Sequence, residues 1–201
     1  MKLYYSPTSP FVRIVHIAAR EKGLMDRIEL IPARAEGADL DARNPLDKIP
    51  TLITDEGETL IESRLIAAYL DELGPPRLYP DDAVERRCVL QREAVVLGVM
   101  EAVGLRRQET RRPEPERSAW WIGRQMAKIE RGLAKIEAEL DAFTAGDGIV
   151  AIELCCALEF MDRFAAEIPE FAWRTGHPRL AAWHAAFAER PSVAATRPGP
   201  A

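Results

Sequence analysis

A proline placed directly before a short apolar run constrains the fold of this chain more than any other feature. Residues 51–54 form that run, which is apolar at Leu52 and Ile53 and flanked by threonines. A polar turn at 55–58 follows, and residues 59–61 repeat the Thr-Leu-Ile pattern, which predicts a β-hairpin. Pro50 precedes the first strand, where a sheet tolerates a residue that cannot donate a backbone hydrogen bond. X-Pro bonds are almost the only peptide bonds that adopt the cis form. A cis Ile49–Pro50 bond would turn the backbone groups of Ile49 outward, toward an extended peptide-like ligand.

The hairpin leads directly into a predicted helix over 63–73. Apolar residues recur at helical spacing from Leu65 to Leu70, and Ser63 stands before them as the expected N-cap. The backbone N–H groups at a helix start favour an anion. Glu62 and Ser63 are therefore expected beside a site for a charged ligand.

The first third of the chain alternates between strand and helix patterns. Strands are predicted at 2–6 and 28–32, a helix at 10–22, and a short helical turn at 39–43, each before the hairpin and the helix at 63–73. This β-α-β-α-β-β-α order predicts an α/β thioredoxin-like domain.

The remainder of the chain predicts an all-α helical bundle. The rigid turn residues Gly74, Pro75 and Pro76 mark the change, so we expect domains at 1–74 and 82–201 joined by a linker at 75–81. Helices are predicted over 84–109, along the apolar repeat from 122 to 140, and over 149–158. The last is apolar nearly all round and should be buried, with Gly148 or Asp147 as its N-cap.

Composition limits the classes of function. The 201 residues carry a formal net charge of −5, which argues against nucleic acid as a partner. We expect a soluble cytoplasmic protein, because neither a signal-peptide pattern nor an apolar run of membrane-spanning length is present. The three histidines lack metal-ligand spacing, so we expect no metal. Cys155 and Cys156 are interpreted as small core residues.

Two segments together carry a resemblance to a known family. Asn44-Pro45-Leu46-Asp47-Lys48-Ile49-Pro50 and Glu62-Ser63-Arg64-Leu65-Ile66 resemble the glutathione site of the glutathione S-transferase superfamily. Residues 5–13 are similar to its first strand, loop and helix, and Arg190-Pro191-Ser192 to its usual ending. The resemblance implies that Lys48 reaches the glycyl carboxylate of glutathione, and that Ile49, before Pro50, pairs with the cysteinyl backbone. It implies that Glu62 and Ser63 bind the γ-glutamyl group.

The resemblance also places the activating hydroxyl at Ser9. Pro10 suits the first turn of the helix, so Ser9 is expected to be its N-cap. A serine hydroxyl both accepts and donates hydrogen bonds, so Ser9 could cap the helix and stabilise a thiolate. Alternatives that remain open are Thr8, Ser6, Tyr5 and Tyr4. Since Cys88 is the first cysteine, thiol–disulfide exchange through a protein cysteine at this position is excluded.

The resemblance implies an enzyme that transfers the glutathione thiolate to a small electrophile, in detoxification, as a two-fold homodimer through the helices at 63–73 and 84–109. The second substrate is expected in a cleft lined by Phe11, Val99, Val103 and Arg106. Two alternatives remain. One is another glutathione-dependent enzyme, such as an isomerase, dehalogenase or peroxidase; the other is a non-catalytic protein-binding module of the same fold.

Overall fold

The computed structural model describes residues 1–198 and divides into two compact units. The N-terminal unit comprises residues 1–79 together with the segment that begins at Arg190, and the helical unit comprises residues 80–189. The boundaries between the two units therefore fall after Tyr79 and before Arg190. The domain limits 1–74 and 82–201 stay a prediction.

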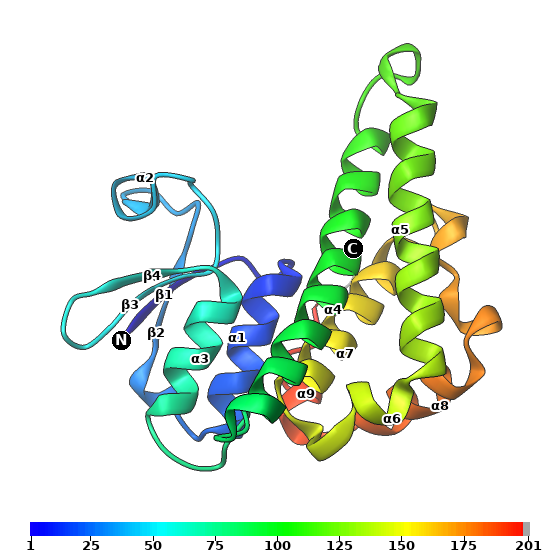
Figure 1. Ribbon diagram of the computed structural model, residues 1–201. Helices are drawn as coiled ribbons and strands as arrows, with labels where there is room; N and C mark the ends of the chain where they lie inside the picture. The colour runs from blue at the N-terminus through cyan, green and yellow to red at the C-terminus, as the bar shows by residue number, and fades with distance from the viewer. Residues whose placement is uncertain (199–201) are drawn as a thin grey trace. The chain divides into compact units, whose positions relative to one another are not determined.

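A mixed four-stranded sheet forms the centre of the N-terminal unit (Figure 1). The strand order is β2-β1-β3-β4. β1 pairs parallel with β2 and antiparallel with β3, which forms the predicted hairpin with β4. The strands are β1 (Lys2–Tyr5), β2 (Glu29–Pro32), β3 (Thr51–Ile53) and β4 (Thr59–Ile61). This small mixed sheet confirms the predicted α/β fold of the first part of the chain.

Helices α1 (Pro10–Glu21) and α3 (Ser63–Glu72) lie side by side on one face of the sheet (Figure 1). The inward face of α1 is apolar, and Ile14, Ile17 and Ala18 are fully buried. The short helix α2 (Leu40–Arg43) lies on the opposite face, where Leu40 packs with Tyr4 and Ala33. The alternation of side chains along β1 explains the division between the two faces.

The end of the chain returns to the N-terminal unit, which the sequence did not predict. Helix α9 (Pro191–Ala194) packs on α1, and Arg190 forms an ion pair of 2.9 Å with Glu21. The buried Arg13 donates from Nη2 to the carbonyl oxygen of Val193 over 3.3 Å. These contacts attach the last described helix to α1.

A buried lysine holds the turn that leaves α3. Lys22 Nζ lies 3.1 Å from Asp71 Oδ1, and the two side chains are 1% and 3% exposed. The same ammonium group donates to the carbonyl oxygens of Asp71, Gly74 and Pro76. The Asp71 carboxylate in turn accepts the backbone N–H groups of Leu78 and Tyr79. The Lys22–Asp71 pair, together with Arg77, whose Nη1 donates to the carbonyl oxygen of Asp71, therefore fixes residues 71–79 against the end of α1.

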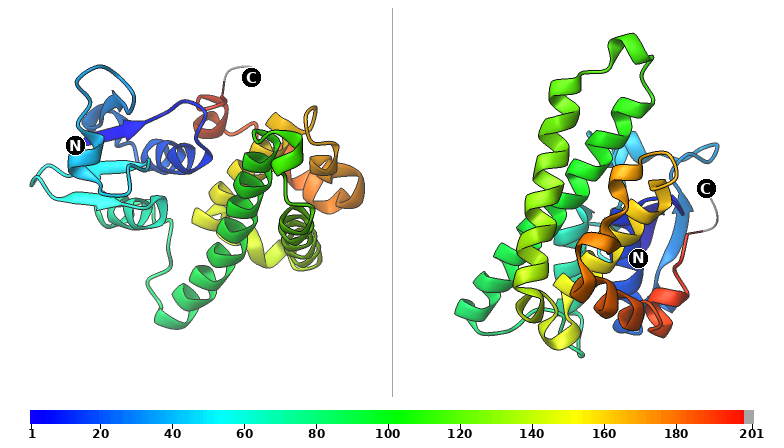
Figure 2. Two further views of the ribbon diagram at one scale, coloured as in Figure 1. Left: turned by 90° about the horizontal axis from the view of Figure 1, so that it is seen from above. Right: turned by 90° about the vertical axis from the view of Figure 1, so that its right-hand side faces the viewer.

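The helical unit is built around two long helices that run side by side (Figure 2). The helices of this unit are α4 (Ala83–Thr110), α5 (Ala119–Ala138), α6 (Leu140–Phe143), α7 (Ile149–Phe164) and α8 (Pro178–Phe187). The two long helices are α4 and α5; α7 packs against α4, and α8 packs against α5. Short 3₁₀ turns connect several of them. This mostly helical part confirms the predicted fold class.

The middle helix of the unit, α7, is buried over most of its surface, as its composition predicted. Residues 149–158 are all buried, including Cys155 and Cys156. Of the two expected N-cap residues, the structure has Gly148, which provides no side-chain hydrogen bond. Among residues 1–198, no helix combines the length and the apolarity needed to cross a bilayer.

Candidate functional site

Strand register brings the predicted site residues to one edge of the sheet. Tyr4 of β1 pairs with Thr51 of β3, and Thr51 pairs with Ile61 of β4. The loop after β1, the residues before β3 and the residues after β4 therefore leave the sheet at the same edge. Helices α1 and α3 both begin there, and two helix N-termini at one edge favour an anionic ligand.

Ser9 is the N-cap of α1, as predicted. Its Oγ accepts the backbone N–H of Val12 over 3.3 Å, and Pro10 is the first residue of the helix. Ser9 remains partly exposed, so its hydroxyl hydrogen stays available to a ligand while the oxygen caps the helix. The cap and donor roles are geometrically compatible at this serine.

The loop that presents Lys48 and Ile49 is held by Asn44, whose role the sequence analysis missed. Asn44 is 1% exposed, and its Nδ2 donates to Lys48 O and to Thr51 Oγ1, each over 3.0 Å. Its Oδ1 accepts the backbone N–H of Leu46 over 3.0 Å, and Thr51 Oγ1 also donates to Lys48 O. The only sign of this role in the sequence is that Asn44 stands seven residues before Thr51, a strand residue. That spacing does not show that the loop closes and brings the two side chains together.

The Ile49–Pro50 bond is cis, as predicted. Pro50 is buried beside the start of β3, Ile49 is partly buried, and Lys48 is exposed. The lysine ammonium group is thus placed in solvent next to the edge at which the helices begin. It is available to pair with a carboxylate.

The start of α3 differs from the prediction by one residue. Ser63 was expected to be the N-cap, but it is the first helical residue, and Glu62 occupies the N-cap position without a side-chain capping bond. Ser63 is 2% exposed, whereas Glu62 is exposed. The N-cap prediction is wrong because the chain turns sharply at Glu62, one residue before the serine.

That turn places Glu62 in a conformation that few residues other than glycine adopt. Its φ is 75° and its ψ is 127°. A non-glycine residue in such a region costs about 1–3 kcal/mol, and such residues cluster at ligand sites. The strained backbone directs Glu62 into solvent at the edge of the sheet where the predicted ligand would lie.

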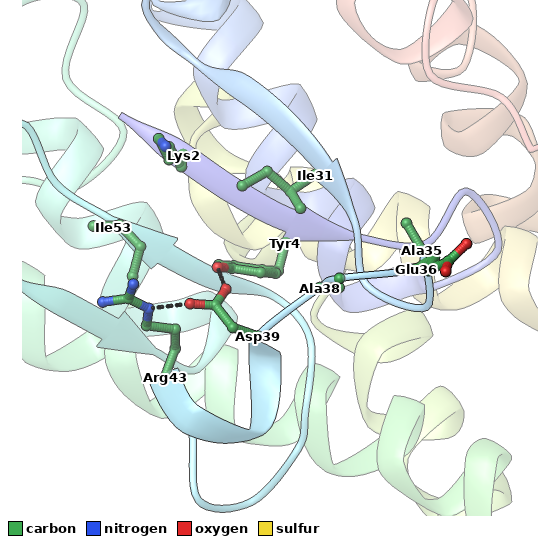
Figure 3. A pocket seen from close by; sticks show the side chains of 10 residues that line it. Lys2, Tyr4, Ile31, Ala35, Glu36, Ala38, Asp39, Arg43 and Ile53 are labelled. Atoms are coloured by element: carbon green, nitrogen blue, oxygen red, sulfur yellow. Dashed lines mark hydrogen bonds and ion pairs between the residues drawn. The ribbon is translucent and has the colours of Figure 1, made fainter.

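Tyr4 is held away from this edge. Its hydroxyl donates to the Asp39 carboxylate on the α2 face of the sheet, and Arg43 Nε donates to the same carboxylate over 2.8 Å (Figure 3). The hydrogen bond to Asp39 is the main cause that raises the pKa of Tyr4, and it lowers the pKa of Asp39. These groups line a pocket of about 350 Å³ with Lys2 and Ile31. A neutral phenol that already donates to Asp39 is poorly suited to activate a thiol.

The other alternative hydroxyls lie near Ser9 in the chain. Ser6 Oγ and Thr8 Oγ1 are 3.2 Å apart and contact each other, and Thr8 is exposed. The Tyr5 ring packs near His16 of α1, with ring centroids 5.9 Å apart. Among these groups, Ser9 is the one that caps a helix.

The residues predicted to line a second-substrate cleft have diverse environments. Phe11 is partly exposed, Val103 is fully buried, and Val99 packs against the backbone of Gly132 on α5. Arg106 is 9% exposed and donates to Glu170 Oε1 over 3.3 Å. Their role as a cleft stays a prediction.

Comparisons with known proteins identify the family. Residues 8–73 match the family model described as glutathione S-transferase, N-terminal domain. An uncharacterised GST-like protein of Escherichia coli (strain K12) is 34% identical, and the alignment covers 98% of each chain. This chain belongs to the glutathione S-transferase superfamily.

Solved structures of the superfamily share the fold over the whole length. A glutathione transferase family member from Pseudomonas fluorescens Pf-5, with bound glutathione, is 37% identical with a TM-score of 0.91, and 98% of each chain is covered. A glutathione S-transferase from Methylobacillus flagellatus KT with bound glutathione is 32% identical with a TM-score of 0.90, covering 98% of this chain and 99% of the other. The superfamily relationship therefore extends through the helical unit as well as the sheet.

Proposed function

We propose that this protein is a glutathione transferase that joins the thiolate of glutathione to small electrophilic substrates. The observation that carries the proposal is the partly exposed Ser9 hydroxyl at the N-terminus of α1, on the edge of the sheet where α3 also begins. A hydroxyl donor and a helix N-terminus both favour the thiolate over the thiol. Relatives at 32% and 37% identity have glutathione bound, which supports glutathione as the thiol.

Each part of the tripeptide has a proposed counterpart at this edge. The exposed Lys48 ammonium group would pair with the glycyl carboxylate, and the backbone of Ile49 before Pro50 with the cysteinyl residue. Glu62 and Ser63 would bind the γ-glutamyl amine and carboxylate. The supporting observations are the buried Asn44 network that fixes the first loop and the strained φ of Glu62 at the start of α3.

In the proposed reaction the Ser9 hydroxyl stabilises the thiolate and does not act as a base. The thiol proton leaves to solvent, and the sulfur forms a bond to the electrophilic carbon while the leaving group departs with the bonding electrons. Phe11, Val99, Val103 and Arg106 are the proposed contacts of the electrophile. A homodimer through α3 and α4, a cytoplasmic location and a role in detoxification complete the proposal. Leu65 on α3 and Val84 on α4 are exposed apolar residues consistent with such a dimer.

Calorimetry with glutathione tests the binding part of the proposal. Ser63→Ala should weaken binding by about 1 kcal/mol or more, because a buried hydroxyl ligand is lost. Ser118→Ala is the control for loss of a serine hydroxyl outside the proposed site, since Ser118 belongs to the helical unit, where it caps α5. Equal affinity in Ser63→Ala and the parent would remove Ser63 from the site.

An activity panel tests the reaction. Aryl halides, epoxides, hydroperoxides and unsaturated acids are offered with glutathione, and turnover is expected with an aryl halide or an epoxide. Turnover confined to hydroperoxides or to isomerisation would replace the transferase assignment by another glutathione-dependent reaction. Binding of glutathione without turnover of any class would support a binding module.

A further inference from the structure

Three side chains with metal-binding atoms meet inside the helical unit, and none of them belongs to the proposed glutathione site. Cys155 and Glu159 stand four residues apart on α7, so they share one face of the helix, and His184 comes from α8. Their thiol, carboxylate and imidazole donor atoms all lie within 4.8 Å of one another. Cys155 and His184 are buried, and Glu159 is partly exposed.

Two of the three distances within this triad match the spacing of ligands around a tetrahedral metal ion. Cys155 Sγ lies 3.5 Å from Glu159 Oε1, and His184 Nε2 lies 3.4 Å from the same oxygen. Zinc binds sulfur, nitrogen and oxygen ligands at about 2.0–2.3 Å, which places neighbouring tetrahedral ligands about 3.3–3.8 Å apart. Both separations from Glu159 Oε1 fall in that range, and Cys155 Sγ lies within 4.8 Å of a ring nitrogen of His184.

The imidazole of His184 provides an independent indication. It is 6% exposed, and its Nε2 finds no hydrogen-bond partner of acceptable geometry within residues 1–198, although Glu159 lies close. Buried polar atoms are nearly always hydrogen-bonded, so such an atom calls for an explanation. The Trp173 ring packs edge-on against the imidazole at a centroid distance of 5.6 Å and restricts its rotation. Nε2 is therefore held toward the carboxylate and the thiol.

We propose that Cys155, Glu159 and His184 bind a zinc-type divalent metal ion. A thiolate, an imidazole and a carboxylate form a borderline-soft set that suits Zn²⁺ better than Mg²⁺ or Ca²⁺. Three protein ligands leave a fourth position for water or a small ligand. The prediction that no metal is bound was based on the spacing of the histidines alone. That spacing could not reveal this set of residues, because His184 lies on a different helix from Cys155 and Glu159.

Binding of the metal ion has a defined proton balance. The Cys155 thiol, which now donates to Glu159, becomes a thiolate, and its proton passes to solvent. The imidazole binds as the neutral ring through Nε2, and the carboxylate binds in its ionised form. No electron transfer is involved. The ion would replace the weak thiol–carboxylate and imidazole–carboxylate contacts with three metal–ligand bonds.

Cobalt spectroscopy on the full-length, metal-stripped protein tests the proposal. One equivalent of Co²⁺ is added without glutathione, because free thiols bind the metal themselves. We expect a thiolate-to-cobalt charge-transfer band and the visible bands of tetrahedral Co²⁺, and Zn²⁺ should abolish both. Zinc at about one hundred times its Kd should raise the Tm by about 5–10 °C.

Matched variants identify the ligands. Cys155→Ser should lose the charge-transfer band, whereas Cys156→Ser, at a neighbouring buried cysteine, should keep it. Glu159→Gln changes a partly exposed residue and should reduce the zinc-induced rise in Tm to less than half. A parent protein with no charge-transfer band and no zinc-dependent change in Tm would overturn the proposal and leave an ordinary imidazole–carboxylate pair. A band that persists in Cys155→Ser would equally refute this ligand set.

Discussion

Replacement of Lys22 by methionine should lower the free energy of unfolding far more than the same replacement of an exposed lysine. The ammonium group is 3.1 Å from Asp71 Oδ1 in surroundings where both side chains are almost completely buried. It also donates to the carbonyl oxygens of Asp71 and Pro76, over 3.0 and 2.6 Å. Methionine has a similar length but supplies no donor. The variant therefore removes the nearer cation of a buried carboxylate, which keeps only Arg77 Nη1 at 3.8 Å from its Oδ2, and leaves several carbonyl groups without this donor.

The magnitude follows from the loss of one partner of a buried pair, which costs about 3–5 kcal/mol. The Asp71 carboxylate keeps the N–H groups of Leu78 and Tyr79, so we expect about 3 kcal/mol, toward the lower end of that range. Lys135→Met is the matched control. Lys135 pairs with Glu139 over 2.6 Å on a half-exposed helix surface, where such a pair contributes about 0.3–0.5 kcal/mol.

Urea unfolding followed by far-ultraviolet circular dichroism measures both variants. The signal reports the sheet as well as the helices, whereas every tryptophan lies between 120 and 183. We expect the midpoint of Lys22→Met to fall well below that of the parent, and Lys135→Met to unfold almost at the parent's midpoint. Two variants whose free energies of unfolding agree within about 1 kcal/mol would refute the argument that the Lys22–Asp71 pair fixes residues 71–79.

Three further predictions concern the N-terminal unit. Asn44→Ala should cost about 1–3 kcal/mol of stability and weaken glutathione binding several-fold in calorimetry, because buried loop groups lose their partners; the exposed Arg34→Met is the control, and equal affinities would contradict the role of the loop. Glu62→Gly should leave the Tm unchanged or higher while glutathione binding weakens, since glycine relieves the positive φ; a fall of several degrees in the Tm would show that the turn is not strained. Burial, aided by the charge of Arg20, lowers the pKa of His16 below its ordinary 6.5, so the unfolded chain binds this proton first and stability should fall as the pH drops below about 6.5. His16→Leu should reduce that loss between pH 7 and 5 in urea unfolding, and identical pH slopes would contradict it.

Much of the fold was predictable because local patterns and tertiary packing agree. Strand alternation, the helix start at Ser9 and Pro10, and the proline before β3 each specify the same structure that long-range packing adopts. The N-cap of α3 is Glu62, one residue before the predicted Ser63. Residue propensities did not indicate this position, because they do not predict a positive φ at a glutamate. Helix limits derived from sequence commonly differ by a residue or two for this reason.

The features that sequence did not predict depend on contacts between distant residues. Asn44 fixes the Lys48 loop through hydrogen bonds that exist only once the loop closes on β3. The return of Arg190 to Glu21 joins residues 169 positions apart, and no local pattern announces it. The Cys155 and His184 donors likewise meet only through the packing of α7 and α8.

The central claim is that the Ser9 hydroxyl stabilises the thiolate of bound glutathione. Its contribution as a hydrogen-bond donor must be separated from its contribution as an N-cap. Ser9→Ala removes both contributions and therefore cannot separate them. Ser9→Asp keeps a good N-cap but removes the donor and adds a negative charge beside the sulfur. Ser118→Ala controls for the loss of an equivalent cap, and Tyr4→Phe for the loss of a hydroxyl that already donates to Asp39.

Ultraviolet titration of the thiolate in the complex with glutathione measures this stabilisation directly. We predict that Ser9→Asp stays folded, that the pKa of its bound thiol rises by about one unit or more, and that turnover falls at least about tenfold, which corresponds to about 1.4 kcal/mol. Ser118→Ala and Tyr4→Phe should leave that pKa at the parent's value. An unchanged pKa and unchanged turnover in both Ser9→Asp and Ser9→Ala would contradict the account and transfer the search for the activating hydroxyl to Thr8 or Tyr5.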